Sequence, residues 1–179
     1  MKILDSIIRF FRDLLWPPKS PSNVQPKEQP NDRPASGGVP RSATPPPSGN
    51  APWLALARKE DGTREIVGKN HNPRILEYFK EAGHPEIVND ETAWCAAFVG
   101  AMLKRSGYAG TGTLVARDYL KWGTELKKPK LGCIAVFKRG NSSWEGHVGF
   151  YVGEDANYVF VLGGNQSNAV NVSKWPKSK

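Results

Sequence analysis

Apolar residues follow helical spacing in separate stretches of the first two thirds of the chain and strand spacing in the last third. Residues 1–16, 72–83 and 92–107 place apolar side chains three or four positions apart, as amphipathic helices do. Shorter helices are expected from Pro52 and over residues 114–122. Four short stretches rich in Val and aromatic residues then predict strands at Cys133–Phe137, His147–Val152, Tyr158–Leu162 and Ala169–Val172. Helices followed by an antiparallel sheet predict an α+β fold, with the helix over residues 92–107 packed on the sheet.

The first 52 residues differ in composition from the remainder of the chain. Residues 1–16 predict an amphipathic helix whose apolar side chains cover an arc of about 160°, and Pro17 and Pro18 end it. It is too short and too charged to span a bilayer, so we expect it to lie on a membrane surface or to pack on a protein. Residues 17–52 hold eleven of the fifteen prolines and no aromatic residue, which predicts a disordered linker. Residues 53–179 are the expected folded domain.

Cys95 falls in the first turn of the helix predicted over residues 92–107, whether Asp90 or Thr92 caps that helix. Free N–H groups and the positive end of the helix dipole favour a thiolate there, and the same N–H groups can hold an oxyanion. A small buried core cysteine would have the same pattern. Cys95 and Cys133 are the only cysteines, too few for a disulfide framework or a structural zinc site. We expect both to be free thiols.

Two downstream residues can complete a cysteine-dependent site. His147, one of three histidines, stands at the start of a predicted strand between two glycines. Asn165 follows the end of the next predicted strand. A thiol, then a base that takes its proton, then a polar group that orients the base is the order of a papain-like site. The other two histidines, His71 and His84, flank the helix predicted over residues 72–83 and are expected on the surface.

The segments WCAAFV, GCIAVF, GHVGFYVG and VLGGNQ occur in this order between residues 94 and 166. Together they resemble the endolysin-like cysteine hydrolases of phages and prophages, which are relatives of the CHAP and NlpC-type cell-wall amidases and endopeptidases. The resemblance extends from Trp53 to about Val172. It implies Cys95 as nucleophile, His147 as base and Asn165 as third member. The chain departs from the family where Gly163 and Gly164 replace an acidic residue that often precedes the amide, and at Cys133, a position that is often acidic or small.

The resemblance implies a papain-like fold and a peptidoglycan hydrolase that cleaves an amide bond of the stem peptide or of the muramoyl-peptide link. No metal or cofactor is expected. Three other functions fit the same residues: an antibacterial effector with the same chemistry, an inactive wall-binding module, and a membrane-active N-terminal peptide on an inert carrier. We expect a monomer, a phage or prophage lysis enzyme, and peptidoglycan as the partner.

The formal net charge of +8 is unevenly distributed. Nine basic residues between Lys104 and Arg139 are opposed only by Asp118 and Glu125, which suits an anionic cell-wall polymer or a merely solvated face. Nucleic acid is not expected, because no recognised binding motif accompanies the charge. Charges interrupt the apolar N-terminal stretch, so no signal peptide is expected. The protein would then be made in the bacterial cytoplasm and reach the wall through a phage pore or a secretion machine.

Overall fold

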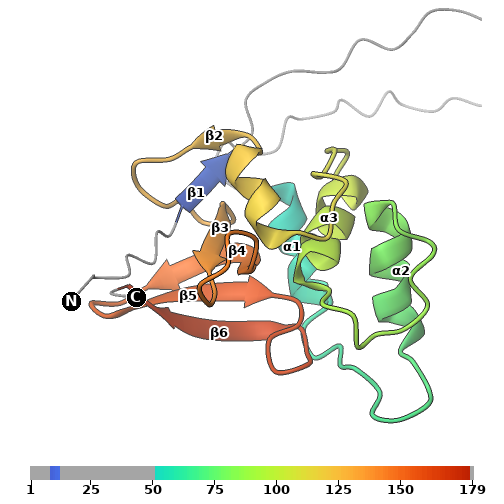
Figure 1. The fold of residues 1–179 in the computed structure, drawn as a ribbon. Coiled ribbons are helices and arrows are strands. Elements are labelled where there is room, and N and C mark those ends of the chain that lie inside the picture. The colour runs from blue at the N-terminus through green and yellow to red at the C-terminus, as the bar shows by residue number, and fades with distance from the viewer. Residues whose placement is uncertain (1–8, 13–50, 178–179) are drawn as a thin grey trace, which may run out of the picture.

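The computed structural model describes residues 9–12 and 51–177, and only the backbone of residues 9–12. Three α-helices lie beside an antiparallel sheet (Figure 1). In chain order the elements are β1 (Arg9–Arg12), α1 (Pro52–Lys59), α2 (Pro73–Ala82), α3 (Cys95–Arg105), the 3-10 helix η1 (Ala116–Lys121), β2 (Thr124–Glu125), β3 (Ile134–Lys138), β4 (Gly146–Glu154), β5 (Tyr158–Gly163) and β6 (Asn171–Pro176). The strand order is β2-β1-β3-β4-β5-β6, and each neighbouring pair is antiparallel. The predicted α+β architecture, with helices packed on an antiparallel sheet, is confirmed.

Helix α2 shows why local sequence predicts the helices well. The Asn72 side chain accepts a hydrogen bond from the Arg74 backbone N–H at 2.9 Å, which satisfies one of the free donors at the helix start. Pro73 occupies the first turn, where its missing N–H costs nothing. Gly83 ends the helix in the left-handed conformation, with φ of 101°, as the sequence predicted.

The caps predicted for α3 were wrong. Trp94 occupies the N-cap position, and no side chain caps the helix there. The Thr92 hydroxyl instead donates to the Asn89 side-chain oxygen at 2.8 Å, and Asp90 is turned toward an earlier loop. Cys95 is nevertheless the first residue of α3, so it lies in the first turn as predicted.

Asp90 fixes the loop that leads into α3. Its buried carboxylate accepts hydrogen bonds from the backbone N–H groups of Ile66 and Asn72, at 3.0 and 2.9 Å, and lies 2.9 Å from His71 Nδ1. Burial alone would raise the pKa of Asp90, but these hydrogen bonds lower it below its ordinary value. The carboxylate therefore joins the segment before α2 to the segment before α3.

The helix predicted over residues 1–16 was wrong for Arg9–Arg12, which form strand β1. The strand pairs with β3 through Arg9–Val136, Phe10–Ala135 and Phe11–Ile134, and with β2 on its other side. These residues form a strand despite their helical periodicity, because the edge of β3 offers unpaired backbone groups that a strand satisfies. The remainder of the predicted helix, and residues 17–50 of the predicted linker, lie outside the described residues. Within the described residues, no helix is long and apolar enough to cross a membrane.

The later elements agree with the prediction except at their ends. Strand β6 begins at Asn171, two residues later than expected, and runs on to Pro176. Ala169, expected in that strand, makes only an isolated bridge to Arg64. The short helix expected over residues 114–122 is the 3-10 helix η1, and β2 was not predicted.

The central strands are buried on both faces. Toward the helices, side chains such as Val136 and Val148, which are paired in register, join the core around α3. On the other face lies a smaller cluster that includes Phe137 and Tyr151. His147 is the second residue of β4 and pairs in register with Phe137. The alternation of side chains along a strand therefore places His147 beside the second cluster.

A buried ion cluster joins the three α-helices. Glu60, at the end of α1, accepts hydrogen bonds from Arg74 and Tyr78 of α2, at 2.9 and 2.7 Å, and from Arg105 of α3 at 2.7 Å. Burial would raise the pKa of Glu60, but the bonds from Arg74 and Tyr78 and the charge of Arg105 lower it to about 2. The Glu60 carboxylate therefore holds α2 and α3 in place against α1.

Candidate active site

Cys95 is held at the start of α3 by the packing of its neighbour Trp94. The Trp94 indole N–H donates to the Glu65 carboxylate at 2.7 Å, and the ring is fully buried. On its other side the ring meets the turn after β5, where a Cβ at Gly164 would lie 2.5 Å from a ring carbon. Glycine is therefore required at this close approach. The turn after β5 and the Glu65 loop together fix the orientation of the first turn of α3.

The Cys95 thiol meets the start of β4. The side chain is close to the backbone N–H of Val148, which acts to lower the pKa of the thiol. Val148 directly follows His147, but side chains alternate along a strand, so the His147 ring lies on the face of β4 opposite Val148 and α3. Cys95 is only 7 % exposed. Burial raises the pKa of its thiol, and the Val148 N–H and the Arg139 charge offset only part of this effect.

His147 is fully buried in an aromatic sandwich. Its ring stacks on Trp175 of β6, with centroids 4.8 Å apart and planes 14° apart, and Phe137 lies 6.4 Å away. Neither ring nitrogen has a hydrogen-bond partner among the described residues. Burial and, to a smaller extent, the nearby Arg139 charge lower the pKa of His147 to about 3, although the Gln166 side chain acts in the opposite direction. The imidazole is therefore neutral at ordinary pH.

Gln166 lies on the Nε2 side of the imidazole. A Cβ at Gly163 would be 3.2 Å from His147 Nε2 and 3.4 Å from the Gln166 amide, so both groups meet at the end of β5. The Gln166 amide donates to the Asn171 carbonyl at 2.7 Å, and its oxygen accepts from the Trp175 indole at 3.0 Å. Gln166 therefore holds in place the tryptophan that covers His147.

Asn165, the predicted third member, stands in a left-handed turn with φ of 56°. No hydrogen bond joins its side chain to another described residue, whereas the neighbouring Gln166 is buried and acts on His147. Sequence reasoning did not select Gln166, although it is part of the same GGNQ segment. The structure thus places Gln166 beside His147, whereas no described contact joins the His147 ring to the Cys95 thiol. The role of Asn165 stays a prediction.

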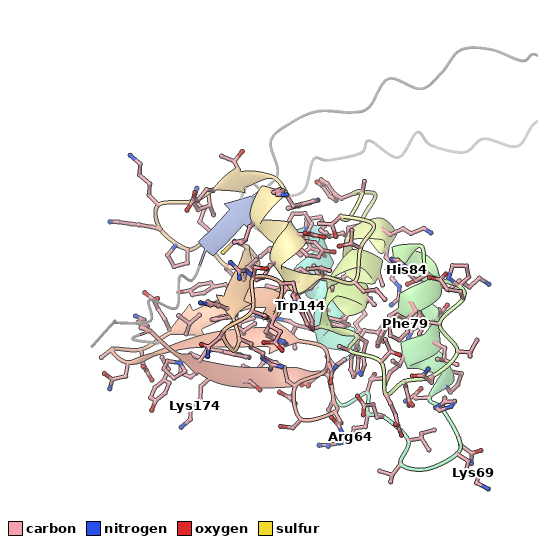
Figure 2. All side chains as sticks on the ribbon, viewed as in Figure 1. Arg64, Lys69, Phe79, His84, Trp144 and Lys174 are labelled. Atoms are coloured by element: carbon pink, nitrogen blue, oxygen red, sulfur yellow. The ribbon has the colours of Figure 1, made fainter. Side chains whose placement is uncertain are left out.

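The other thiol and the other two histidines lie elsewhere. Cys133 is buried in the second cluster, where burial raises the pKa of its thiol to about 11. His71 binds Asp90 in the lead-in loop. His84 contacts Glu86 and lies beside α2, away from the sheet in Figure 2. Within residues 9–12 and 51–177, no group of three or more His, Cys, Asp or Glu side chains could hold a metal ion.

Cys95 and His147 both lie in a part of the chain that matches a known protein family. Residues 87–165 match the family model of the CHAP domain. The match starts before α3, includes Cys95 and His147, and ends at Asn165. The CHAP domain is a papain-like cysteine amidase/peptidase family, so the match implies a cell-wall amidase or peptidase with peptidoglycan as substrate. A search of the curated proteins and a search of the solved structures found no match for this chain.

Proposed function

We propose that this protein is a peptidoglycan hydrolase whose nucleophile is Cys95 and whose general base is His147. The observation that carries the proposal is the position of Cys95 as the first residue of α3, packed against the start of β4, where the Val148 N–H acts to lower the pKa of its thiol. A thiol with access to free helix-terminal N–H groups thus lies against the strand that carries His147, whose ring nitrogens have no hydrogen-bond partner among the described residues.

The pKa directions define the resting state as a neutral thiol and a neutral imidazole. In the reaction, His147 takes the Cys95 proton as the sulfur attacks the carbonyl carbon of an amide. The carbonyl oxygen becomes an oxyanion, which the Cys95 backbone N–H stabilises. The imidazolium then gives its proton to the leaving amine, and an acyl-thioester remains. His147 next takes a proton from water as the water oxygen attacks the thioester carbonyl. The C–S bond then breaks, the carboxylic acid leaves, and the imidazolium returns its proton to the thiolate.

A polar group beside His147 Nε2 would orient the imidazole and stabilise its charged form. Asn165 is the residue that the family resemblance implies, and Gln166 is the residue whose amide lies on the Nε2 side of the ring. We assign the orienting role to one of these two amides. The scissile bond is an amide of the stem peptide or the muramoyl-peptide link, and the proposed role is wall lysis by an endolysin-like enzyme delivered through a pore or a secretion machine.

Digestion of purified peptidoglycan, followed by mass spectrometry of the released fragments, tests this function. The wild-type protein should release fragments with new amino termini. Cys95→Ser should release none, whereas Cys133→Ser is the matched thiol control and should retain most activity. Full activity of Cys95→Ser would refute the proposed mechanism.

The burial of the site favours one second candidate. Because Cys95 is 7 % exposed and His147 is fully buried, the described conformation leaves little room for a substrate carbonyl at the sulfur. A catalytically inactive wall-binding module would show such a closed site. In that case wild-type protein and Cys95→Ser would bind sacculi equally, and neither would release fragments.

A further inference from the structure

The loop between β3 and β4 carries one tryptophan that the fold does not use. Trp144 is 64 % exposed, whereas Trp53 and Trp94 are buried in the core. Its indole N–H makes no hydrogen bond to another described residue. An indole this exposed leaves a large flat apolar surface in water, and such surfaces are common at binding sites.

The loop that carries Trp144 is held by hydrogen bonds at three points. The Arg139 backbone N–H donates to the Glu145 carbonyl at 3.2 Å, which closes the loop at its base. The Glu145 backbone N–H donates to the Ser142 hydroxyl at 3.0 Å. From η1, the Arg117 guanidinium reaches the Ser142 carbonyl at 3.4 Å. The exposed ring therefore stands on a braced loop, which lowers the entropy cost of binding a ligand.

Both ends of this loop lead to the candidate active site. Trp144 precedes His147 by three residues, so the two Cα atoms are at most about 10 Å apart. At the other end, the Arg139 guanidinium lies over the Trp175 ring, 5.1 Å from its centroid, and that ring covers His147. Trp144 therefore belongs to a loop that adjoins the strand ends carrying the candidate active site.

We propose that Trp144 is a specificity-determining residue that binds a pyranose ring of the glycan strand next to the scissile amide. This inference rests on the proposed function. The flat C–H face of a pyranose fits an indole face, and sugar hydroxyls can accept from the free indole N–H. Arg139 of the same loop and Arg117, which bonds to the loop from η1, are cations that would face the carboxylates of peptidoglycan stem peptides.

The direct test uses the inactive Cys95→Ser protein and a probe without peptide, a soluble oligomer of β-1,4-linked N-acetylglucosamine. Titration should shift the Trp144 indole N–H resonance in a heteronuclear NMR spectrum. Backbone amide resonances of the same loop should shift with it. These amide shifts should vanish in the Cys95→Ser/Trp144→Ala protein, whereas Cys95→Ser/Trp144→Phe should show them at higher probe concentration. Val67→Ala is the matched control, because Val67 is 97 % exposed and belongs to another loop. No shift of the Trp144 resonance up to millimolar probe would overturn the inference.

Kinetics on intact peptidoglycan separate this inference from the proposed function. With the catalytic residues intact, Trp144→Ala should raise the half-saturating substrate concentration about tenfold, equivalent to about 1.4 kcal/mol of binding, and leave kcat within about twofold. If wild-type protein releases no fragments, the proposed function fails. If wild-type and Trp144→Ala proteins release fragments with the same half-saturating concentration, the function stands and the glycan-binding role of Trp144 fails.

Discussion

Protonation of His147 should control the acid stability of the fold. The pKa of His147 is about 3 in the folded protein because the ring is fully buried, against an ordinary value of 6.5. Between these two values the unfolded chain binds one proton more than the folded chain. The free energy of unfolding therefore falls as the pH falls, and this contribution is fully lost below pH 3.

The size of the effect follows from the two pKa values. In a linkage calculation, lowering the pH from 7 to 5 costs the folded protein about 2 kcal/mol through His147 alone. Carboxylates with depressed pKa values add little in this window. Glu60, for example, starts from 4.5 and is lowered to about 2, so its contribution is lost only in more acidic solution.

His147→Phe is the informative variant, because phenylalanine can stack on Trp175 and Phe137 without taking up a proton. Urea unfolding of both proteins at pH 7 and pH 5 gives four free energies of unfolding. Contributions from every other titrating group are shared and cancel in the difference between the two proteins. We expect the variant to gain about 2 kcal/mol on the wild-type protein between pH 7 and pH 5.

Two measurements could contradict the burial of His147. A change in the difference of less than about 0.5 kcal/mol, within the usual error of such comparisons, would mean that His147 is not buried as described. An NMR titration gives an independent check. The His147 ring signals should keep their neutral-form positions at pH 5, and a midpoint near 6.5 would refute the burial.

Two further substitutions test the helix core and the orienting group. Glu60→Gln should lower the free energy of unfolding by about 3 kcal/mol, because Arg74 and Arg105 lose a buried counter-charge; thermal unfolding measures this, with the more exposed Glu77→Gln as control. Gln166→Ala should reduce kcat/KM on peptidoglycan about 10–1000-fold and more than Asn165→Ala does, and a larger loss in Asn165→Ala would return the orienting role to Asn165.

The sequence predicted those features that local residues determine. Asn72, Pro73 and Gly83 each act within one helical turn, so α2 was predicted to the residue. Cys95 was placed in the first turn of its helix because the apolar spacing starts there. The α+β order of elements followed from the change of period near Cys133.

Features that depend on distant partners were missed. Arg9–Arg12 have helical periodicity, yet the edge of β3, more than a hundred residues later in the chain, pairs with them as a strand. Asp90 or Thr92 was expected to cap α3, but two backbone N–H groups of an earlier loop bind Asp90 instead.

The residues that surround His147 could not be predicted from the sequence either. Nothing near His147 in the sequence indicates that Trp175, 28 residues later, covers its ring. Asn165 and Gln166 are adjacent in sequence, and the positive φ of Asn165 helps decide which of the two amides faces the imidazole. The sequence thus predicted the residue types of the site. Their burial, and which of Asn165 and Gln166 lies beside the imidazole, depended on the tertiary fold.

The central claim is that the Cys95 sulfur forms a covalent bond with the acyl group of a cell-wall amide. Acid quenching of the enzyme during turnover of soluble peptidoglycan fragments, followed by mass spectrometry of its proteolytic peptides, tests this claim most directly. The account predicts an acyl adduct on the peptide that contains Cys95, no adduct on the peptide that contains Cys133, and loss of the adduct in His147→Ala. Turnover with an adduct on Cys133, or undiminished turnover by Cys95→Ser, would contradict it.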